Sequence, residues 1–452
     1  MQIIPPGVRR MLAYLNANRE QLDFENRLSG VSKGAPAKRL RPHVKATAAS
    51  VHKIWERLVV DTDATEIDKL ELADPKSLVD AALYTANIEN YIGTVKVPLG
   101  IVGPIRINGV NANGDFFAPL ATTEAALVAS YARGAELVRA VGGVSAALLS
   151  DSVIRGPAFI FEDLLRSGEF VNWVVQSAET LKEVAETTTS HGKLVGIDPH
   201  LDGDTVFLLC RYMTGDASGQ NMVTVATQAL CEYIVEHCPI TPIHWFVEAN
   251  FSGDKKASFL GMHAGRGRKV TASVEIPETT LKRYLHTDAK TLLKYCRTAN
   301  LGAMLSGQFG VQAHYANALA AFYIATGQDA ACVSESAVGF TRVEPREING
   351  EAGVFVSVTL PNILVGSVGG GTSLPSQSAG MAITNLKGTG QAKALAELVG
   401  ALCLCGELSI LGAISAGHFT RAHEKLARKR CCLLYTSPSP RDLSTSRMPS
   451  SA

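Results

Sequence analysis

The strongest constraint on the fold is a long apolar segment near the C-terminus, LVGALCLCGELSILGAISAGHF at 398–419. It is long enough to cross a membrane as a helix. However, Glu407 lies in its middle, and a charged side chain inside a bilayer is costly. The segment is also rich in Gly, Ala and Ser, which suit close packing against neighbouring elements. It therefore predicts a core helix and no membrane span.

Length and charge exclude several classes of protein. The chain has 452 residues, of which 46% are hydrophobic and 19% charged, and its net charge is +1. The length suits two or three domains with large buried interfaces. The balanced charge argues against binding to nucleic acid or to a charged membrane surface.

Nine cysteines are scattered through apolar stretches, and no pair of CxxC units occurs. This spacing argues against a zinc site, and no metal is expected. Reduced, buried thiols are typical of a cytoplasmic protein. The N-terminal MQIIPPGVRRML has no apolar core followed by a cleavage site, so no signal peptide is expected.

The patterning predicts an α+β fold with distinct regions. Residues 1–80 are charged and mostly helical in pattern, and 157–247 alternate strand-like and helical segments typical of a small α/β unit. Residues 81–156 and 248–430 together predict a large, helix-rich domain with a central long helix and a mixed sheet. Residues 431–452 are rich in Ser, Pro and Thr and predict a disordered tail, which is possibly non-native.

Two local patterns are specific. The dipeptide Asn108-Gly109 between alternating segments predicts a hairpin turn. A helix is predicted from Thr122 to Val141, with Thr122 or Thr123 as its N-cap and Glu124 in its first turn.

Four ionisable residues stand in apolar or small-residue surroundings. They are Glu124 in PLATTEAALVAS, Lys255 in NFSGDKKASFLG, Asp329 in YIATGQDAAC and His423 in SAGHFTRAHEK. A buried charge is costly unless it is paired or used. Four of them, in segments of distinctive sequence, predict an active site assembled from distant parts of the chain.

These segments also carry a resemblance. Together with ENYIG at 89–93, TGDASGQNM at 214–222 and VGSVGGGTSLPSQ at 365–377, they resemble the catalytic portion of 3-hydroxy-3-methylglutaryl-coenzyme A (HMG-CoA) reductases over roughly residues 80–430. The resemblance implies reduction of HMG-CoA to mevalonate and coenzyme A by two hydride transfers from NADPH. It also implies that 157–247 is an inserted ferredoxin-like cofactor domain.

The resemblance implies an assembly as well. Many eukaryotic members carry a membrane anchor ahead of the catalytic portion, and none is expected here. A homo-oligomer, either a dimer or a dimer of dimers, is expected to form through the segment containing Glu89 and Asn90. The site would then take residues from two chains.

The resemblance assigns roles to three of the four ionisable residues as follows. Lys255, rather than its neighbour Lys256, would be the cation near the carbonyl oxygen. Glu124 would be the proton donor for that oxygen, with Asp329 tuning both. Read without the family, Lys255 would be part of a solvated charge run, Glu124 a first-turn glutamate and Asp329 a helix-terminal aspartate.

The fourth role is the acid that protonates the leaving thiolate. Imidazole suits this step because its pKa is near neutral. His418 competes for the role, but the spacing after Ala-Gly-His selects His423. Where the family often has Ser before this histidine, the chain has Ala422, so regulation through that serine is not expected.

Two segments resemble cofactor-binding motifs. Asp216, Gly219 and Asn221 take the polar and glycine positions of one, and the triple glycine at 369–371 lets backbone approach a ligand in the other. Neither is G-x-G-x-x-G after a strand, which argues against a Rossmann fold. Ser190 and Lys193 fall near the family's Ser-Arg pair and favour NADPH over NADH.

Five further residues match substrate-binding positions of the family; they are Arg133, Arg155, Arg297, His314 and Asn317. Arg297 replaces a lysine that pairs with the substrate carboxylate, and a guanidinium has a different geometry. Glu248 stands where a small polar residue is common, and its charge would repel an acidic substrate. Two alternatives stay open, an NAD-dependent relative that oxidises mevalonate and a non-catalytic homologue.

Overall fold

The computed structural model describes residues 6–17 and 44–418. The chain forms two compact units, one ending at Val95 and the other beginning at Lys96. His423 and the predicted tail lie outside the described residues.

The first unit is helical. Its elements are α1 (Pro6–Ala17), α3 (Ala48–Asp61), α4 (Glu66–Leu72), α5 (Pro75–Val79) and the 3-10 helix η1 (Ala81–Tyr84). Thr47 and Thr65 each begin a helix with a capping box, which satisfies backbone N–H groups that the helix leaves free. The indole of Trp55 is buried and donates to the Ile92 carbonyl over 2.8 Å.

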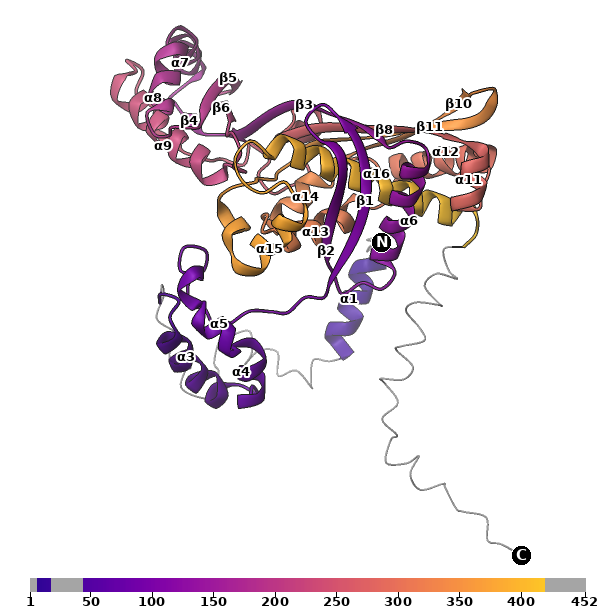
Figure 1. The fold of residues 1–452 in the computed structure, drawn as a ribbon. Helices are drawn as coiled ribbons and strands as arrows, with labels where there is room; N and C mark the ends of the chain where they lie inside the picture. Colours follow the sequence, from indigo (N-terminus) through magenta and orange to yellow (C-terminus); the bar gives the residue numbers. More distant parts are fainter. Residues whose placement is uncertain (1–5, 18–43, 419–452) are drawn as a thin grey trace, which may run out of the picture. The chain divides into compact units, whose positions relative to one another are not determined.

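The second unit is built on an eleven-stranded mixed sheet (Figure 1). Its strands are β1 (Leu99–Gly109), β2 (Asn113–Ala121), β3 (Val144–Arg155), β4 (Ala158–Ile160), β5 (Lys193–Asp202), β6 (Thr205–Met213), β7 (His244–Phe246), β8 (Gly267–Pro277), β9 (Gly310–Val311), β10 (Gly339–Ile348) and β11 (Glu351–Ile363). The larger part runs β2-β1-β3-β8-β11-β10-β9, antiparallel except for the pairs β1–β3 and β9–β10. The α+β class predicted from the sequence is confirmed.

Strand β3 joins the two parts of the sheet. Its first residues pair with β1 and β8, and its last three, Val153–Arg155, pair with β6. Beyond it the strands run β7-β4-β6-β5, all antiparallel. Helices α7 (Leu164–Gln176), α8 (Ala178–Glu186) and α9 (Gln220–His237) accompany these strands.

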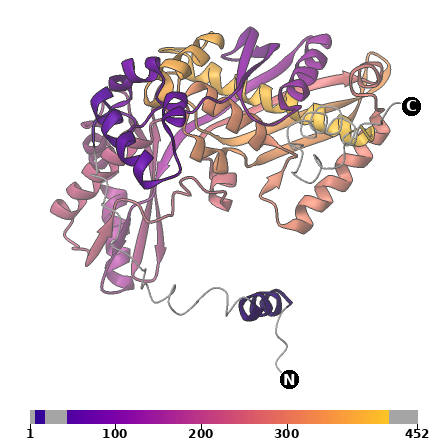
Figure 2. The same ribbon diagram turned by 90° about the horizontal axis from the view of Figure 1, so that it is seen from below.

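Helix α16 (Ala392–Ser415) fills the centre of the second unit. It runs along one face of the sheet and packs against β3, β8 and β11 (Figures 1 and 2). Its approach to α6 (Leu127–Ala140) requires a glycine, because a Cβ on Gly134 would lie 2.0 Å from the Cys405 carbonyl oxygen. It is the one helix of the described ranges that is long and apolar enough to cross a membrane, and most of it is buried inside the protein. The sequence predicted this core helix.

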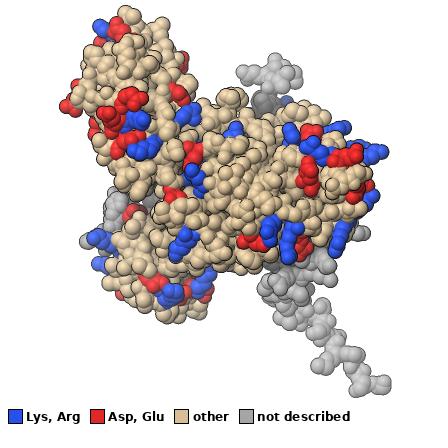
Figure 3. Space-filling view, turned by 45° about the horizontal axis from the view of Figure 1, so that its top comes forward, with Lys and Arg blue, Asp and Glu red and all other residues tan. Residues whose placement is uncertain are grey.

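Shorter elements complete the second unit. They are α10 (Phe259–Ala264), α11 (Glu278–Leu285), α12 (Ala289–Ser306), α13 (Tyr315–Thr326), η2 (Ala330–Cys332), α14 (Val333–Ser336), η3 (Gly370–Ser373) and α15 (Pro375–Ile383). On the face shown in Figure 3, basic and acidic side chains are interspersed rather than gathered by sign.

Two local predictions need correction. Helix α6 begins at Leu127, not Thr122, because the preceding Ala126 has a left-handed φ of 70° and Thr122 Oγ1 instead accepts the N–H of Glu124 in a local turn. Glu124 therefore precedes the helix. The predicted hairpin forms, but Asn108 and Gly109 end β1, and the turn follows at 110–112.

Candidate active site

Lys255 and Asp329 form the first cluster of the site. Lys255 Nζ lies 3.0 Å from Asp329 Oδ2, and both side chains are partly exposed. The hydrogen bond that Lys255 donates to Asp329 raises the pKa of Lys255 despite partial burial. Burial raises the pKa of Asp329, but the hydrogen bonds from Lys255, the Ala331 N–H and Gln220 outweigh it, so the net pKa falls. The pair therefore carries a fixed positive and a fixed negative charge.

The backbone holds Lys255 in an unusual conformation. Its φ is 57°, and Asn250 and Gly253 in the same loop also have positive φ. Non-glycine residues rarely adopt this region, and such strain clusters at functional sites. Gln220, at the start of α9, donates to Asp329 Oδ2 over 3.2 Å and so supports the pair from a third segment.

An ionic network lies beside this loop. The guanidinium of Arg155 is buried and contacts Glu248 at 3.3 Å and Asp254 at 3.2 Å. Asp254 also pairs with buried Arg266, which in turn contacts Glu335 at 2.7 Å. Glu248 is thus neutralised by Arg155 in this structure, and Arg155 is held by two carboxylates before any acidic ligand arrives.

Glu124 belongs to a second cluster, at a cavity of ≈ 640 Å³. Both its carboxylate oxygens accept from Asn317 Nδ2, at 3.4 and 3.3 Å. The cavity is lined by parts of α6, α12, α16 and the loop before α13. His314 and Asn317, two predicted substrate-binding residues, both line it.

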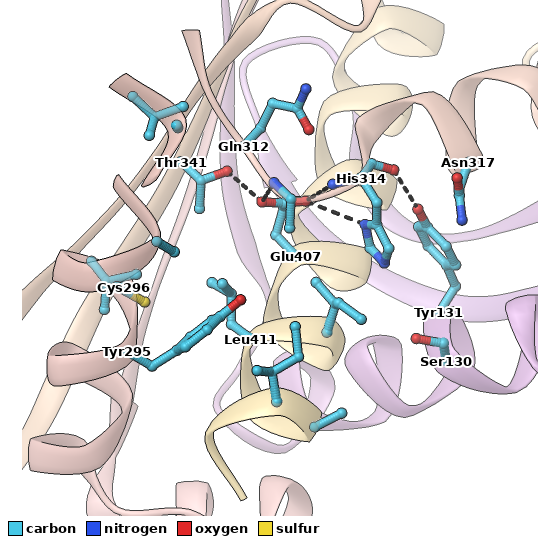
Figure 4. Close-up of a pocket in the computed structure, with 18 of the residues that line it drawn as sticks. Ser130, Tyr131, Tyr295, Cys296, Gln312, His314, Asn317, Thr341, Glu407 and Leu411 are labelled. Atoms are coloured by element: carbon cyan, nitrogen blue, oxygen red, sulfur yellow. Dashed lines mark hydrogen bonds and ion pairs between the residues drawn. The ribbon is translucent and has the colours of Figure 1, made fainter. Parts of the chain in front are cut away.

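Glu407 lies at the same cavity and is fully buried (Figure 4). Its carboxylate accepts the N–H groups of Ala313 and His314, each over 2.9 Å, and the hydroxyl of Thr341 over 2.7 Å. The ring of His314 stacks on Tyr131 with 5.5 Å between centroids.

The two remaining predicted substrate arginines lie differently. Arg133 lines the cavity, and its guanidinium donates to the side chain and carbonyl of Ser409 on α16. Burial lowers its pKa. Arg297 is exposed on α12 and does not line the cavity, although its neighbours Tyr295 and Cys296 do.

Asp216 connects the predicted cofactor segments. Its carboxylate accepts the N–H groups of Gly390 and Ala392 at the start of α16, and its carbonyl accepts the N–H of Ser367. Gly219, with φ 76°, precedes α9, and Asn221 is exposed in the first turn of that helix. Both carboxylate oxygens of Asp216 therefore already accept hydrogen bonds from within the chain.

The triple glycine and the predicted phosphate-binding residues are accessible. Gly369 and Gly370 have positive φ and are exposed, whereas Gly371 packs on Gly327. Ser190 is also exposed. Lys193 Nζ contacts Glu186 Oε2 at 2.7 Å, so much of its charge is already compensated.

The structure thus brings together Lys255 with Asp329, and Glu124 with Asn317, but not the two pairs. Among the described residues of one chain, Glu124 forms no ion pair with Lys255. His418, the competitor of His423, ends the described range, with its ring 5.6 Å from that of His286.

The sequence reasoning missed Glu407 and Gln220 as site residues. Glu407 was visible as a charge within an apolar segment, which was used only to argue against a membrane span. Gln220 stands inside the motif at 214–222, which was interpreted for the cofactor alone. The signal in both cases was a polar residue with no partner nearby in the sequence.

A lysine fixed by an aspartate, and a carboxylate held at a cavity, define an enzyme whose site can stabilise charge on a ligand oxygen and move a proton. A family model described as hydroxymethylglutaryl-coenzyme A reductase matches residues 53–428. The chain belongs to this oxidoreductase family, and the resemblance inferred from the motifs is confirmed.

Curated relatives and solved structures agree with this membership. HMG-CoA reductases of Methanocaldococcus jannaschii and Aeropyrum pernix are 40% and 42% identical, each over 76% of this chain and over 85% and 83% of their own lengths. The structure of a class II HMG-CoA reductase from Streptococcus pneumoniae bound to NADPH has a TM-score of 0.58 at 17% identity, covering 81% of this chain and 98% of that one. At 17% identity, this structural similarity shows a shared fold and nothing more.

Proposed function

We propose that this chain reduces HMG-CoA to mevalonate and coenzyme A, with NADPH as the hydride donor in two successive steps. The observation that carries the proposal is the Lys255–Asp329 pair, set in the family's motifs within a chain of that family. A cation fixed beside the carbonyl oxygen stabilises the negative charge that each reduction places there without rearranging.

Proton transfer needs two further groups. Glu124 is proposed to protonate the carbonyl oxygen. The hydrogen bonds from Asn317 support this role because they orient the carboxyl group of Glu124. His423 is proposed to protonate the thiolate of coenzyme A. Arg155, Arg133, His314 and Asn317 are proposed to bind the substrate. Arg297 remains a proposed partner of its carboxylate.

When bound, NADPH supplies the hydride. The exposed Asn221 and the accessible backbone at 369–371 fit a dinucleotide, as does the open surface at Ser190 and Lys193. Asp216 fits better as the residue that ties these segments to α16, and Gly219 as the left-handed residue before α9. The strand order β7-β4-β6-β5 supports a ferredoxin-like cofactor domain at 157–247.

Within the described residues of one chain Lys255 pairs with Asp329 and not with Glu124, which supports a shared site in a homo-oligomer. We propose a dimer or dimer of dimers that forms through residues 89–93, where Glu89 is exposed. We also propose a cytoplasmic location, which the buried free thiols support. Mixing Glu124→Gln with Lys255→Ala chains should restore part of the activity. A mixture no more active than either variant alone would argue against a shared site.

One assay tests the proposed function. The purified chain is given HMG-CoA with NADPH or NADH, and the absorbance of the reduced nicotinamide is followed beside mevalonate formation. Two NADPH should be oxidised for each mevalonate, with NADH less effective. A folded protein that oxidises neither cofactor, or that works only from mevalonate with NAD, would refute the proposal.

A further inference from the structure

The buried carboxylate of Glu407 does more than accept hydrogen bonds from backbone N–H groups. Helix α16 carries a second fully buried glutamate, Glu397. Glu397 accepts the N–H groups of Asn111, Ala112 and Leu148 and the side-chain amide of Asn111. It fixes a hairpin turn and a strand and lines no part of the cavity. Glu407 does similar work for the backbone at 313–314, but it also faces an ionisable ring.

That ring is His314. Its Nδ1 is buried and lies 3.3 Å from Glu407 Oε1, in a close contact that does not have the geometry of a hydrogen bond. Because an unprotonated nitrogen would turn its lone pair toward the carboxylate and be repelled, we expect the nitrogen that faces Glu407 to carry the hydrogen. The Nε2 atom, on the other side of the ring, is then the nitrogen available to a ligand in the cavity that His314 lines.

The ring is also fixed from its face. Tyr131 stacks on it at an interplanar angle of 17° and donates its hydroxyl to the His314 carbonyl over 3.4 Å. Tyr131 can take this place because position 406 is a glycine, where a Cβ would lie 2.2 Å from the tyrosine ring. Residues 406 and 407 of α16 therefore set the face and the edge of the imidazole (Figure 4).

We propose that Glu407 is a positioning residue that holds the ring and tautomer of His314, so that Nε2 accepts a hydrogen bond from an N–H or O–H group of the substrate. The same contacts hold the start of α13, from which Asn317 reaches Glu124. Naming the substrate as HMG-CoA rests on the proposed function; the geometry of the ring does not.

The chain offers a matched pair of variants. Glu407→Gln and Glu397→Gln each replace a buried acceptor by an amide whose NH₂ must face backbone donors, so both should lower the melting temperature. Only Glu407→Gln should lower kcat/KM for HMG-CoA, by up to about 100-fold, because displacing a positioned group by about 1 Å costs that much. Equal losses of kcat/KM in the two variants, or none in either, would overturn the proposal.

A second measurement does not depend on turnover or on variant stability. In protein labelled with ¹⁵N-histidine, the His314 signals, assigned by their loss in His314→Gln, should show a protonated Nδ1 and an unprotonated Nε2. The opposite tautomer in the wild-type chain would overturn the assignment. If the wild type fails to reduce HMG-CoA, the proposed function falls, while these nitrogen signals still decide the role of Glu407.

Discussion

Asp329 uses its two carboxylate oxygens for different partners: Oδ2 lies 3.0 Å from Lys255 Nζ, and Oδ1 accepts the N–H of Ala331. The second contact caps the short helix η2 and fixes the carboxylate. The lysine is therefore aimed by a group that cannot itself rotate freely. Both the positive charge of Lys255 and the orientation of its ammonium group are set before a ligand binds.

Lys255→Ala should lower kcat by about 10²–10³-fold, the loss typical of removing one preorganised donor to an oxyanion. Lys256→Ala is the matched control, because its Nζ contacts the Asp254 carbonyl at 2.5 Å rather than Asp329. Steady-state kinetics of both variants check this. Near-normal activity of Lys255→Ala would show that the roles are assigned wrongly.

Asp329→Asn should reduce stability in a pH-dependent way. The folded-state pKa of Asp329 is lowered, so its contribution is present above the ordinary value of 3.8 and is lost as pH falls through the folded value. That of Lys255 is raised, so its contribution is lost only at alkaline pH. The difference between wild type and variant should be at most about 1 kcal/mol near neutrality for such a half-exposed pair. Urea unfolding at several pH values should show this gap closing, not widening, in acid.

Glu124→Gln should lower kcat by about 10²–10⁴-fold, the usual contribution of a positioned acid, with little change in melting temperature. Glu136→Gln serves as control, because Glu136 is exposed on α6 away from the cavity. Kinetics and thermal unfolding are measured on both. A control that loses as much activity would point to a general effect of negative charge in this part of the chain.

Glu248→Ser should lower KM for HMG-CoA. The substitution removes one of the two carboxylates that hold Arg155 and leaves its guanidinium freer to meet an acidic ligand. Glu236→Ser removes an exposed charge on α9 and should leave KM unchanged. If Glu248→Ser instead raises KM, the carboxylate positions Arg155 rather than competing for it.

Glu186→Gln should lower KM for NADPH while leaving that for NADH unchanged. Glu186 lies 2.7 Å from Lys193 Nζ, and removing its charge frees the lysine for a 2′-phosphate. Lys193→Ala should have the opposite effect on NADPH alone. Parallel changes for both cofactors would show that this surface does not read the phosphate.

The sequence predicted the elements better than their ends. The apolar run at 398–419 forms most of α16 because hydrophobic patterning decides burial. The start of α6 was wrong because a left-handed Ala126 is set by tertiary packing, and no propensity scale favours alanine there.

The candidate site was predictable where a motif holds the residue and not where a distant partner defines it. Lys255 and Asp329 were found in their segments, and they do meet. The neutralisation of Glu248 by Arg155, and the support of His314 by Glu407, depend on side chains brought together from distant positions. A single sequence carries no record of such pairings.

Helix α16 fills the middle of the larger unit, yet it is the last helix that the structure describes. Strands β1 and β3 and helix α6, which pack against it, are synthesised long before it leaves the ribosome. At about 5–20 residues per second, their apolar faces wait on the order of ten seconds or more for the segment that covers them. Until residues 392–415 have emerged, those faces lack the helix that buries them.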